Sequence, residues 1–400
     1  MLVPERGNSS VELAELGGED GVVSGGQTVQ ETGAVLACPL DLGTDFGKCS
    51  HRMGKRMSRI RHSLLLALAA LAGCGGSEER SEIAYGVVRE EVPTRIVVVE
   101  DDGTDSQRVT GAKRGESPVL PVWSPDGRRL AFVRFRASGG PGSLQVYVVN
   151  ADGSGERLVG EGTQPRWTND GRSLVVERPV APPKASTIHV LSVDGKRQRL
   201  LATGFGAAVS HDGSRVAFVR DSYRRQANQF VVAASSLNTI SLDGTGLRRL
   251  ARTTRGDTRF VQPSWLPDDS RVAVIERRGG LGGPLVTVSS GGQRRVVVPD
   301  VGETYDWSPK DDFVAYTRDG SLFIVRRDGT EVEAFGESNA IDIEWSPDGK
   351  KIAFSMMEAE NAQYVGLYLI DLDKGERRRF ALADGFVAYL DWRPEEPDQP

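Results

Sequence analysis

Apolar and polar residues alternate with a period of two along most of the chain after residue 82. The pattern recurs in six similar segments: RRLAFVR (128–134), RSLVVER (172–178), SRVAFVR (214–220), SRVAVIE (270–276), DFVAYTR (312–318) and KKIAFSM (350–356). A second apolar segment follows each, such as LQVYVVN (144–150), and then a Gly-bearing turn and a short segment such as ERLVG (156–160). Alternation of this kind, rich in β-branched and aromatic residues, predicts β-strands.

A five-residue motif precedes each of these segments. It reads WSPDG at Trp123 and Trp345, WTNDG at Trp167, WLPDD at Trp265, WSPKD at Trp307 and WRPEE at Trp392, with a copy that lacks Trp, VSHDG, at Val209. All six tryptophans of the chain occupy this position, which we call the Trp slot, and successive slots are 44, 42, 56, 42, 38 and 47 residues apart. Four short antiparallel strands in a repeat of this length are typical of a β-propeller blade.

The motif itself has a structural explanation. Pro125 suits the second position of a type I turn, Asp126 tolerates the third, and Gly127 supplies the positive φ that follows. Ser124 and Asp126 are expected to cap the backbone groups of the turn, and Trp123 to pack between one blade and the next. We therefore interpret the Trp slot as architecture rather than as a catalytic signature.

The repeats predict an all-β protein, a seven-bladed propeller with four-stranded antiparallel blades. Six blades are the alternative, if the divergent unit at 209–260 is irregular. The last copy, VAYLDWRP (387–394), has only a polar tail after it, whereas EIAYGVV (82–88), TRIVVVE (94–100) and SQRVTG (106–111) match the second, third and fourth strands of a blade. The last blade is therefore expected to combine one C-terminal strand with three N-terminal strands, which removes the open edges of the ring.

The repeat resembles the WD-like β-propeller repeat of TolB-type proteins over nearly all of 82–400. The resemblance implies a propeller of the cell envelope, because TolB is a periplasmic partner of the Tol–Pal system. Two departures are visible. TolB-type proteins carry an α/β domain before a propeller that usually has six blades, and only about 20 residues separate Cys74 from the strands near Arg95 here. A lipid anchor is also foreign to TolB, so the resemblance extends to the repeat and not to the TolB role.

The segment before the repeats resembles a bacterial lipoprotein signal peptide. Basic residues precede a short apolar run, and LAGC (71–74) matches a lipobox, which implies cleavage before Cys74 and lipid attachment to it. We expect residues 53–74 to be the signal peptide and 75–81 a tether to the propeller at 82–400. Residues 1–52 would then be a disordered leader or would come from a misplaced start, with translation beginning at Met53 or Met57. The expected location is the bacterial cell envelope, exported and held at the membrane through a lipid anchor only.

Composition and motifs limit the partners and catalytic groups that the chain is expected to have. The formal net charge is −5 with acidic and basic residues interspersed, so no nucleic-acid partner is expected. The three cysteines all lie at or before Cys74, and no nucleophile motif, phosphate-binding loop or pair of histidines at metal-ligand spacing is present. His189 and His211 are expected to be structural. The sequence predicts no catalytic residue, no metal and no cofactor, and a monomer.

One candidate binding site is an acidic arc at the central channel. The residue before the Trp slot is Asp306, Glu344 and Asp391 in three successive copies, Asp342 precedes Glu344 by two positions, and Arg166 holds the same slot in an earlier copy. Equivalent positions of adjacent blades lie near one another, so this arc is expected to bind a cation or a basic peptide, or to be a hydrated charged rim.

The second candidate is the stretch DSYRRQANQFVVAASSLN (221–238), which accounts for the 56-residue spacing. We expect a long loop that presents Tyr223, Arg224, Arg225 and Phe230, residue types that suit protein interfaces. The leading hypothesis is therefore a non-catalytic, lipid-anchored envelope propeller that binds a protein or peptide. The alternative is a propeller that binds or hydrolyses a carbohydrate or small molecule at its channel, since a fold does not choose between them.

Overall fold

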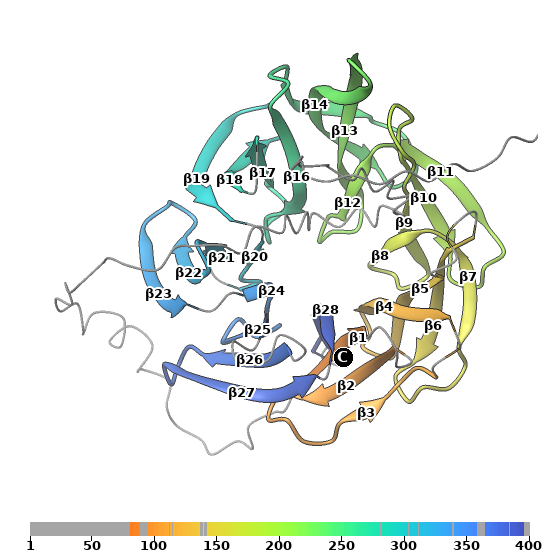
Figure 1. Ribbon diagram of the computed structural model, residues 1–400, viewed down its shortest axis with the longest axis vertical. Helices are drawn as coiled ribbons and strands as arrows, with labels where there is room; N and C mark the ends of the chain where they lie inside the picture. The colour runs from red at the N-terminus through yellow and green to blue at the C-terminus, as the bar shows by residue number, and fades with distance from the viewer. Residues whose placement is uncertain are drawn as a thin grey trace, which may run out of the picture. The chain divides into compact units, whose positions relative to one another are not determined.

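The computed structural model describes residues 81–395, apart from 89–93, 112, 114, 137–138, 140–141, 280–281, 303, 311, 338–339, 358–364 and 384. All regular elements of these residues are strands, and they form seven sheets of four antiparallel strands each. Figure 1 shows the sheets arranged as the blades of a ring. The prediction of a seven-bladed propeller is confirmed, and the six-bladed alternative is wrong, because the 209–260 unit forms a complete blade.

The first four blades follow the chain without interruption. Blade 1 contains β4 (Glu116–Trp123), β5 (Arg129–Arg136), β6 (Leu144–Asn150) and β7 (Arg157–Glu161). Blade 2 contains β8 (Thr163–Trp167), β9 (Ser173–Arg178), β10 (Thr187–Ser192) and β11 (Gln198–Thr203). Blade 3 contains β12 (Phe205–Val209), β13 (Arg215–Gln226), β14 (Gln229–Ser241) and β15 (Arg248–Thr253). Blade 4 contains β16 (Thr258–Trp265), β17 (Arg271–Arg278), β18 (Gly283–Ser289) and β19 (Arg294–Val301).

The remaining blades include the closure of the ring. Blade 5 contains β20 (Tyr305–Trp307), β21 (Phe313–Arg318), β22 (Ser321–Arg326) and β23 (Glu331–Glu337). Blade 6 contains β24 (Ala340–Trp345), β25 (Lys351–Met357), β26 (Val365–Asp371) and β27 (Glu376–Ala383). Blade 7 contains β28 (Phe386–Trp392), β1 (Glu82–Val88), β2 (Arg95–Glu100) and β3 (Gln107–Arg108). The predicted closure by one C-terminal and three N-terminal strands is confirmed.

Each blade is covered on both faces, which explains its apolar second strands. In β5 the residues Leu130 to Val133 are all fully buried, although their side chains alternate between the two faces of the sheet. A strand covered on both faces needs a continuous apolar run rather than strict alternation. The neighbouring blades supply this cover, so every blade depends on the next for its core.

The Trp slot performs the predicted packing. Each of its six tryptophans is buried and belongs to a core cluster that includes residues of the preceding blade. Trp167 Nε1, for example, donates to the Val122 carbonyl of blade 1 at 3.0 Å, and Trp345 Nε1 donates to the Asp306 carbonyl of blade 5 at 3.1 Å. Four of the tryptophans therefore join adjacent blades through both apolar contact and a hydrogen bond, whereas Trp123 and Trp307 do so through apolar contact.

The turn after the Trp slot also has the predicted geometry. Gly127 has φ of 63° and its N–H donates to the Ser124 carbonyl at 2.8 Å. Ser124 Oγ donates to Asp126 Oδ1 and accepts from the Arg129 N–H, so the two side chains hold the turn closed. The motif is a structural cap that starts the second strand of blades 1 to 6.

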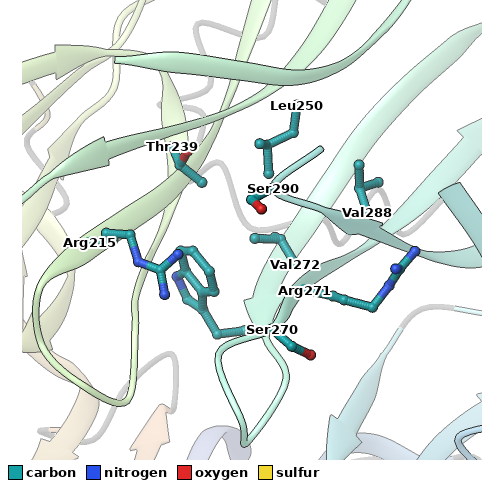
Figure 2. A pocket seen from close by; sticks show the side chains of 9 residues that line it. Arg215, Thr239, Leu250, Ser270, Arg271, Val272, Val288 and Ser290 are labelled. Carbon is teal, nitrogen blue, oxygen red and sulfur yellow. The ribbon is translucent and has the colours of Figure 1, made fainter. Parts of the chain in front are cut away.

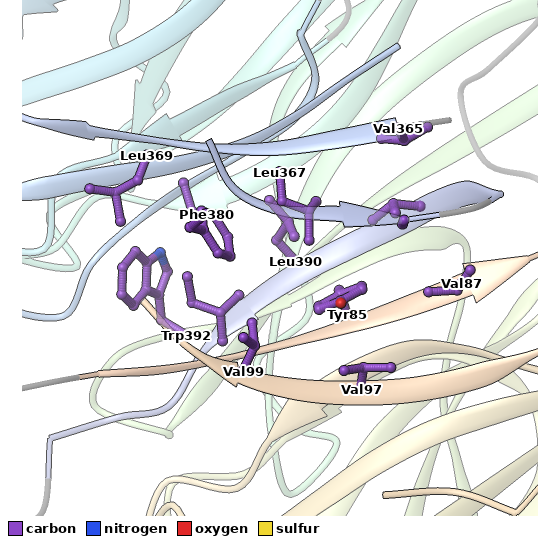
Figure 3. Close-up of a cluster of buried hydrophobic side chains, with 14 residues drawn as sticks. Tyr85, Val87, Val97, Val99, Val365, Leu367, Leu369, Phe380, Leu390 and Trp392 are labelled. Carbon is purple, nitrogen blue, oxygen red and sulfur yellow. The ribbon is translucent and has the colours of Figure 1, made fainter. Parts of the chain in front are cut away.

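The ring closes through a large apolar interface between blades 6 and 7. Figure 3 shows Leu367, Leu369 and Phe380 of blade 6 facing Leu390 and Trp392 of β28, with residues of β1 and β2 beside them. β28 pairs with β1 in antiparallel register, Ile83 opposite Trp392. Segments from the two ends of the propeller thus share one core.

Five of the innermost strands contain the same irregularity. Three positions before the Trp slot, the backbone adopts a positive φ at Leu120 (58°), Gln164 (48°), Gly206 (63°), Gln262 (51°) and Tyr389 (66°). The strand registers shift at these points, which marks a β-bulge. A bulge removes the next backbone N–H from the hydrogen-bond ladder of the sheet. This N–H then needs another acceptor, unless the residue is proline, which has no N–H.

Candidate functional site

The acidic arc lies on the innermost strands of blades 5, 6 and 7, next to the centre of the ring in Figure 1. Burial raises the pKa of Asp306 and Asp391 to about 7 and that of Asp342 to about 6, and the neighbouring carboxylates add to the shifts of Asp306 and Asp391. Burial together with Asp306, Asp391 and Asp342 raises the pKa of Glu344 well above its usual range. The structure therefore brings these four carboxyl groups close enough to influence one another's charge.

Three of the four carboxylates are hydrogen-bond acceptors for the neighbouring blade. Asp306 Oδ2 accepts from the Trp345 N–H at 2.9 Å, and Asp391 Oδ2 accepts from the Trp123 N–H at 2.5 Å. Asp342 Oδ2 accepts from the Leu390 N–H at 2.8 Å. These carboxylates join innermost strands of successive blades, so part of the acidic arc is structural.

A fifth carboxylate, which no sequence motif indicated, also accepts a hydrogen bond from the next blade. Glu177 of β9 is buried, its Oε1 accepts from the Ala207 N–H at 2.7 Å, and burial raises its pKa to about 7. Ala207 directly follows the bulge residue Gly206. The acceptor for the N–H freed by the bulge of blade 3 is therefore a side chain of blade 2.

In all five bulged strands, the backbone N–H that follows the bulge is either absent or has a side-chain acceptor. The residue after the bulge is proline in three of them: Pro121, Pro165 and Pro263. Proline has no N–H and needs no acceptor. In blade 3 the residue is Ala207, and Glu177 accepts from its N–H. In blade 7 it is Leu390, and Asp342 accepts from its N–H. The presence of Glu177 and Asp342 thus follows from the absence of proline in the next blade.

Arg166 and Glu344 complete the charged groups of the channel. Arg166 is exposed and donates to its neighbour's carbonyl, Pro165 O, at 3.1 Å. Its positive charge lowers the pKa of Asp342, Glu344 and Asp391, against the larger effect of their burial. Because burial favours protonated carboxyls here, the arc carries less negative charge at neutral pH than its composition indicates.

The arc is not arranged as a metal site. Within the described part of the chain, no group of three or more His, Cys, Asp or Glu side chains is positioned to hold a metal ion. His189 Nε2 lies 3.0 Å from Thr187 Oγ1, and His211 Nδ1 lies 3.0 Å from Asp269 Oδ1 of the next blade. Each of these histidines thus has a partner of its own within the propeller.

A small cavity lies between blades 3 and 4 (Figure 2). Arg215, Trp265 and Arg271 line it, with the Arg215 guanidinium 4.4 Å from the centre of the Trp265 ring. Its volume of about 20 Å³ is close to the space that one water molecule needs. The Arg271 guanidinium donates to the Thr287 and Gln293 carbonyls. The cavity is too small for an organic ligand.

The stretch predicted as a long loop in blade 3 is a β-hairpin, so that part of the prediction is wrong. β13 and β14 stay paired as far as Gln226 opposite Gln229, well beyond the strands on either side of them. The β-branched and aromatic residues Tyr223, Phe230, Val231 and Val232 favour strands over a loop. Figure 1 shows this hairpin extending beyond the neighbouring blades at β13 and β14.

The hairpin presents the four residues that the sequence singled out. Arg224, Arg225 and Phe230 are exposed, Phe230 by 44%, and Tyr223 is partly buried. Arg225 stands directly opposite Phe230, and Tyr223 opposite Val232, so these four side chains share one face of the hairpin. The result is a surface that combines aromatic area with positive charge.

The base of the hairpin is fixed to blade 4. Asp221, which is buried, lies 2.6 Å from Arg259 Nε, and the Arg259 guanidinium stacks 4.7 Å from the centre of the Phe205 ring. Ser235 Oγ accepts from the Phe260 N–H at 3.1 Å. These contacts give the exposed end of the hairpin a defined position, although nothing in the sequence identified Arg259 as the partner of Asp221.

Comparisons with known proteins agree with this architecture. No family model matches the chain. The fold defines a seven-bladed β-propeller, and its repeats are TolB-like. The chain is 36% identical over 77 residues to the Tol-Pal system protein TolB of Alcanivorax borkumensis, which covers 18% of this chain and 17% of that protein. It is 31% identical over 120 residues to TolB of Hydrogenovibrio crunogenus, which covers 27% of this chain and 26% of that protein.

These matches span only about a sixth to a quarter of each TolB protein, so they characterise the repeat rather than the whole protein. Among solved structures, the periplasmic gluconolactonase PpgL of Pseudomonas aeruginosa superposes with a TM-score of 0.56 and 14% identity. That alignment covers 80% of this chain and 100% of the gluconolactonase chain. At this identity the likeness concerns the fold alone.

Proposed function

We propose that the chain is an exported, lipid-anchored propeller of the bacterial cell envelope that binds a protein or peptide partner and does not catalyse a reaction. The observation that carries the proposal is the β13–β14 hairpin. It presents Tyr223, Arg225 and Phe230 on one face, and its base is anchored by the Asp221–Arg259 ion pair. Aromatic and arginine side chains on a rigid support are the residue types that dominate protein interfaces.

The channel supports a catalytic role less well. Asp306, Asp342 and Asp391 already accept hydrogen bonds from the next blade. A residue that holds the ring together is poorly placed to change partners during a reaction. The likeness to a gluconolactonase is one of fold and does not by itself favour the alternative of a small-molecule site.

Two features support the location. The repeats are TolB-like, and LAGC ending at Cys74 matches a lipobox, although Cys74 lies outside the described residues. In the described part of the chain, no helix has the length and apolar character needed to span a bilayer. We expect Cys74→Ser to abolish incorporation of a labelled fatty acid and to move the protein from the membrane fraction to the soluble one.

The binding role can be tested in the native cell by site-specific photo-crosslinking. A photoreactive residue placed at Phe230 is expected to give a discrete crosslinked protein. The same residue at Val296 of β19, which is equally exposed at 45% but lies on another blade, serves as the control. Equal crosslinking from both positions, or none from Phe230, would contradict the proposed role of the hairpin.

A further inference from the structure

The β13 strand has a backbone edge that no other described strand covers. β12 pairs with β13 as far as Val219, which stands opposite Phe205, whereas β13 continues to Gln226. From Ser222 to Gln226, the strand pairs with β14 alone, and no other backbone hydrogen bond of the described residues reaches this stretch. An edge with unpaired N–H and C=O groups is a template for an added strand.

The opposite edge of the hairpin is not open in the same way. A methyl group on Gly256 would lie 3.4 Å from the Val232 carbonyl oxygen, so the segment that joins β15 to β16 runs against β14 here. The Arg224 guanidinium lies beside the same glycine, at 3.5 Å from that position. An incoming strand therefore has access to β13, on the side where β12 ends.

The hairpin that carries this edge is positively charged. Residues 222–234 contain Arg224 and Arg225 and no acidic residue. Arg252 and Arg255 are exposed near the end of β15, on the β14 side of the hairpin, where Asp257 is the acidic residue of the same segment. The Asp221 carboxylate is already paired with Arg259 and does not neutralise the hairpin arginines.

We propose that the β13 edge from Ser222 to Gln226 captures an extended, acidic segment of a protein partner as an added antiparallel or parallel strand. The inference rests on the proposed function and names the chemistry of the partner. Main-chain hydrogen bonds to β13 supply affinity, and the positive charge of the hairpin, with the Arg225 side chain on one face of β13, selects acidic side chains in the added strand. Tyr223, which shares a face with Arg225, offers apolar contact to the added strand.

The test uses the purified propeller and a fluorescent peptide of about ten residues in which Glu alternates with Val, a pattern that suits a strand. A matched peptide has Lys in place of Glu, and a third has the acidic sequence with consecutive backbone nitrogens methylated, which removes the N–H donors of both edges of a strand. We expect binding of the acidic peptide alone. Binding of the methylated peptide with equal affinity, or no binding of the acidic peptide, would overturn the proposal.

A pair of charge-reversal variants locates the site. Arg224→Glu with Arg225→Glu should weaken binding of the acidic peptide by about tenfold or more, because the positive charge of the hairpin becomes negative and repels the peptide. Arg248→Glu with Arg249→Glu, an exposed pair on β15 of the same blade, makes the same change in net charge and should leave affinity within about twofold. Equal loss in both variants would show non-specific attraction and overturn the proposal. Crosslinking from position 230 that persists in that case would leave the proposed function standing.

Discussion

The Asp391 carboxylate accepts a hydrogen bond from the backbone N–H of Trp123 at 2.5 Å, and so joins the innermost strand of the last blade to that of the first. The two residues are 268 positions apart in the sequence. Pairing of β28 with β1 closes blade 7, but it is the Asp391–Trp123 contact that connects blade 7 to blade 1 at the channel. The same position in blade 5, Asp306, makes the equivalent bond to Trp345.

This contact predicts the effect of removing the acceptor. Asp391→Ala leaves a buried N–H without a partner and should lower the free energy of unfolding by about 1–3 kcal/mol. Asp391→Asn keeps an oxygen acceptor and removes a charge that its neighbours disfavour, so its cost should be smaller. Urea unfolding at pH 7 measures both, and an equal loss for Ala and Asn would refute the role of the hydrogen bond.

The raised pKa values predict an unusual pH dependence. Asp306 and Asp391 titrate at about 7 and Asp342 at about 6 in the folded protein, against 3.8 for an ordinary Asp. The folded state therefore binds more protons between these values. This contribution to stability is fully present below about pH 4 and is lost as pH rises through about 7.

An opposite effect sets the acid limit. Hydrogen bonds from Ser210 and Ser214 hold the pKa of Asp212 at about 2. For Asp268, hydrogen bonds from Ser270 and Arg327 outweigh burial and give the same value. Their contribution is lost as pH falls below about 4. We expect the urea midpoint to be higher at pH 5 than at pH 8, and Asp306→Asn to reduce that difference. A midpoint that rises from pH 5 to pH 8 would contradict the account.

The alternation between proline and a carboxylate predicts a compensating pair of substitutions. Glu177→Val should leave the buried Ala207 N–H without an acceptor, and Ala207→Pro should leave the buried Glu177 carboxylate without this donor. Each change should lower the free energy of unfolding by about 1–3 kcal/mol. The double variant reproduces the solution used at Pro121, Pro165 and Pro263 and should recover most of the loss. A double-mutant cycle measures the coupling, and additive losses would show that Glu177 has another role.

The hairpin should be separable from the fold. Replacing residues 223–232 by a two-residue turn leaves the Asp221–Arg259 pair and the paired base of β13 and β14 in place. Because the removed side chains are largely exposed, the free energy of unfolding should change by less than about 1 kcal/mol, while co-purification of the protein that crosslinks at position 230 of the full-length chain is lost. Unfolding of the shortened protein under native conditions would mean that the hairpin belongs to the core.

Much of the fold was predictable because its signals are local. The Trp slot, the Ser-Pro-Asp-Gly turn and the apolar second strand can each be recognised within about ten residues. The number of their copies predicts the number of blades. The hydrogen bonds of Asp306, Asp342 and Asp391 were not predictable, because each carboxylate accepts from an N–H of another blade. The same residue types would also suit a solvent-exposed rim of the channel, so the sequence alone does not distinguish the two roles. Glu177 was missed for this reason, although the absence of proline before Ala208 was a signal. The hairpin was read as a loop because an insertion in one repeat has no equivalent in the others to show its pairing.

We propose that the β13–β14 hairpin binds the partner and that the acidic arc supports the ring. The most direct measurement compares partner crosslinking in the native cell for two double variants with a common crosslinking position at Phe230. Arg224→Glu with Arg225→Glu should abolish the crosslinked product, whereas Arg166→Gln with Glu344→Gln in the channel should leave it unchanged. Loss of the product in the channel variant, with the hairpin variant unaffected, would contradict the account.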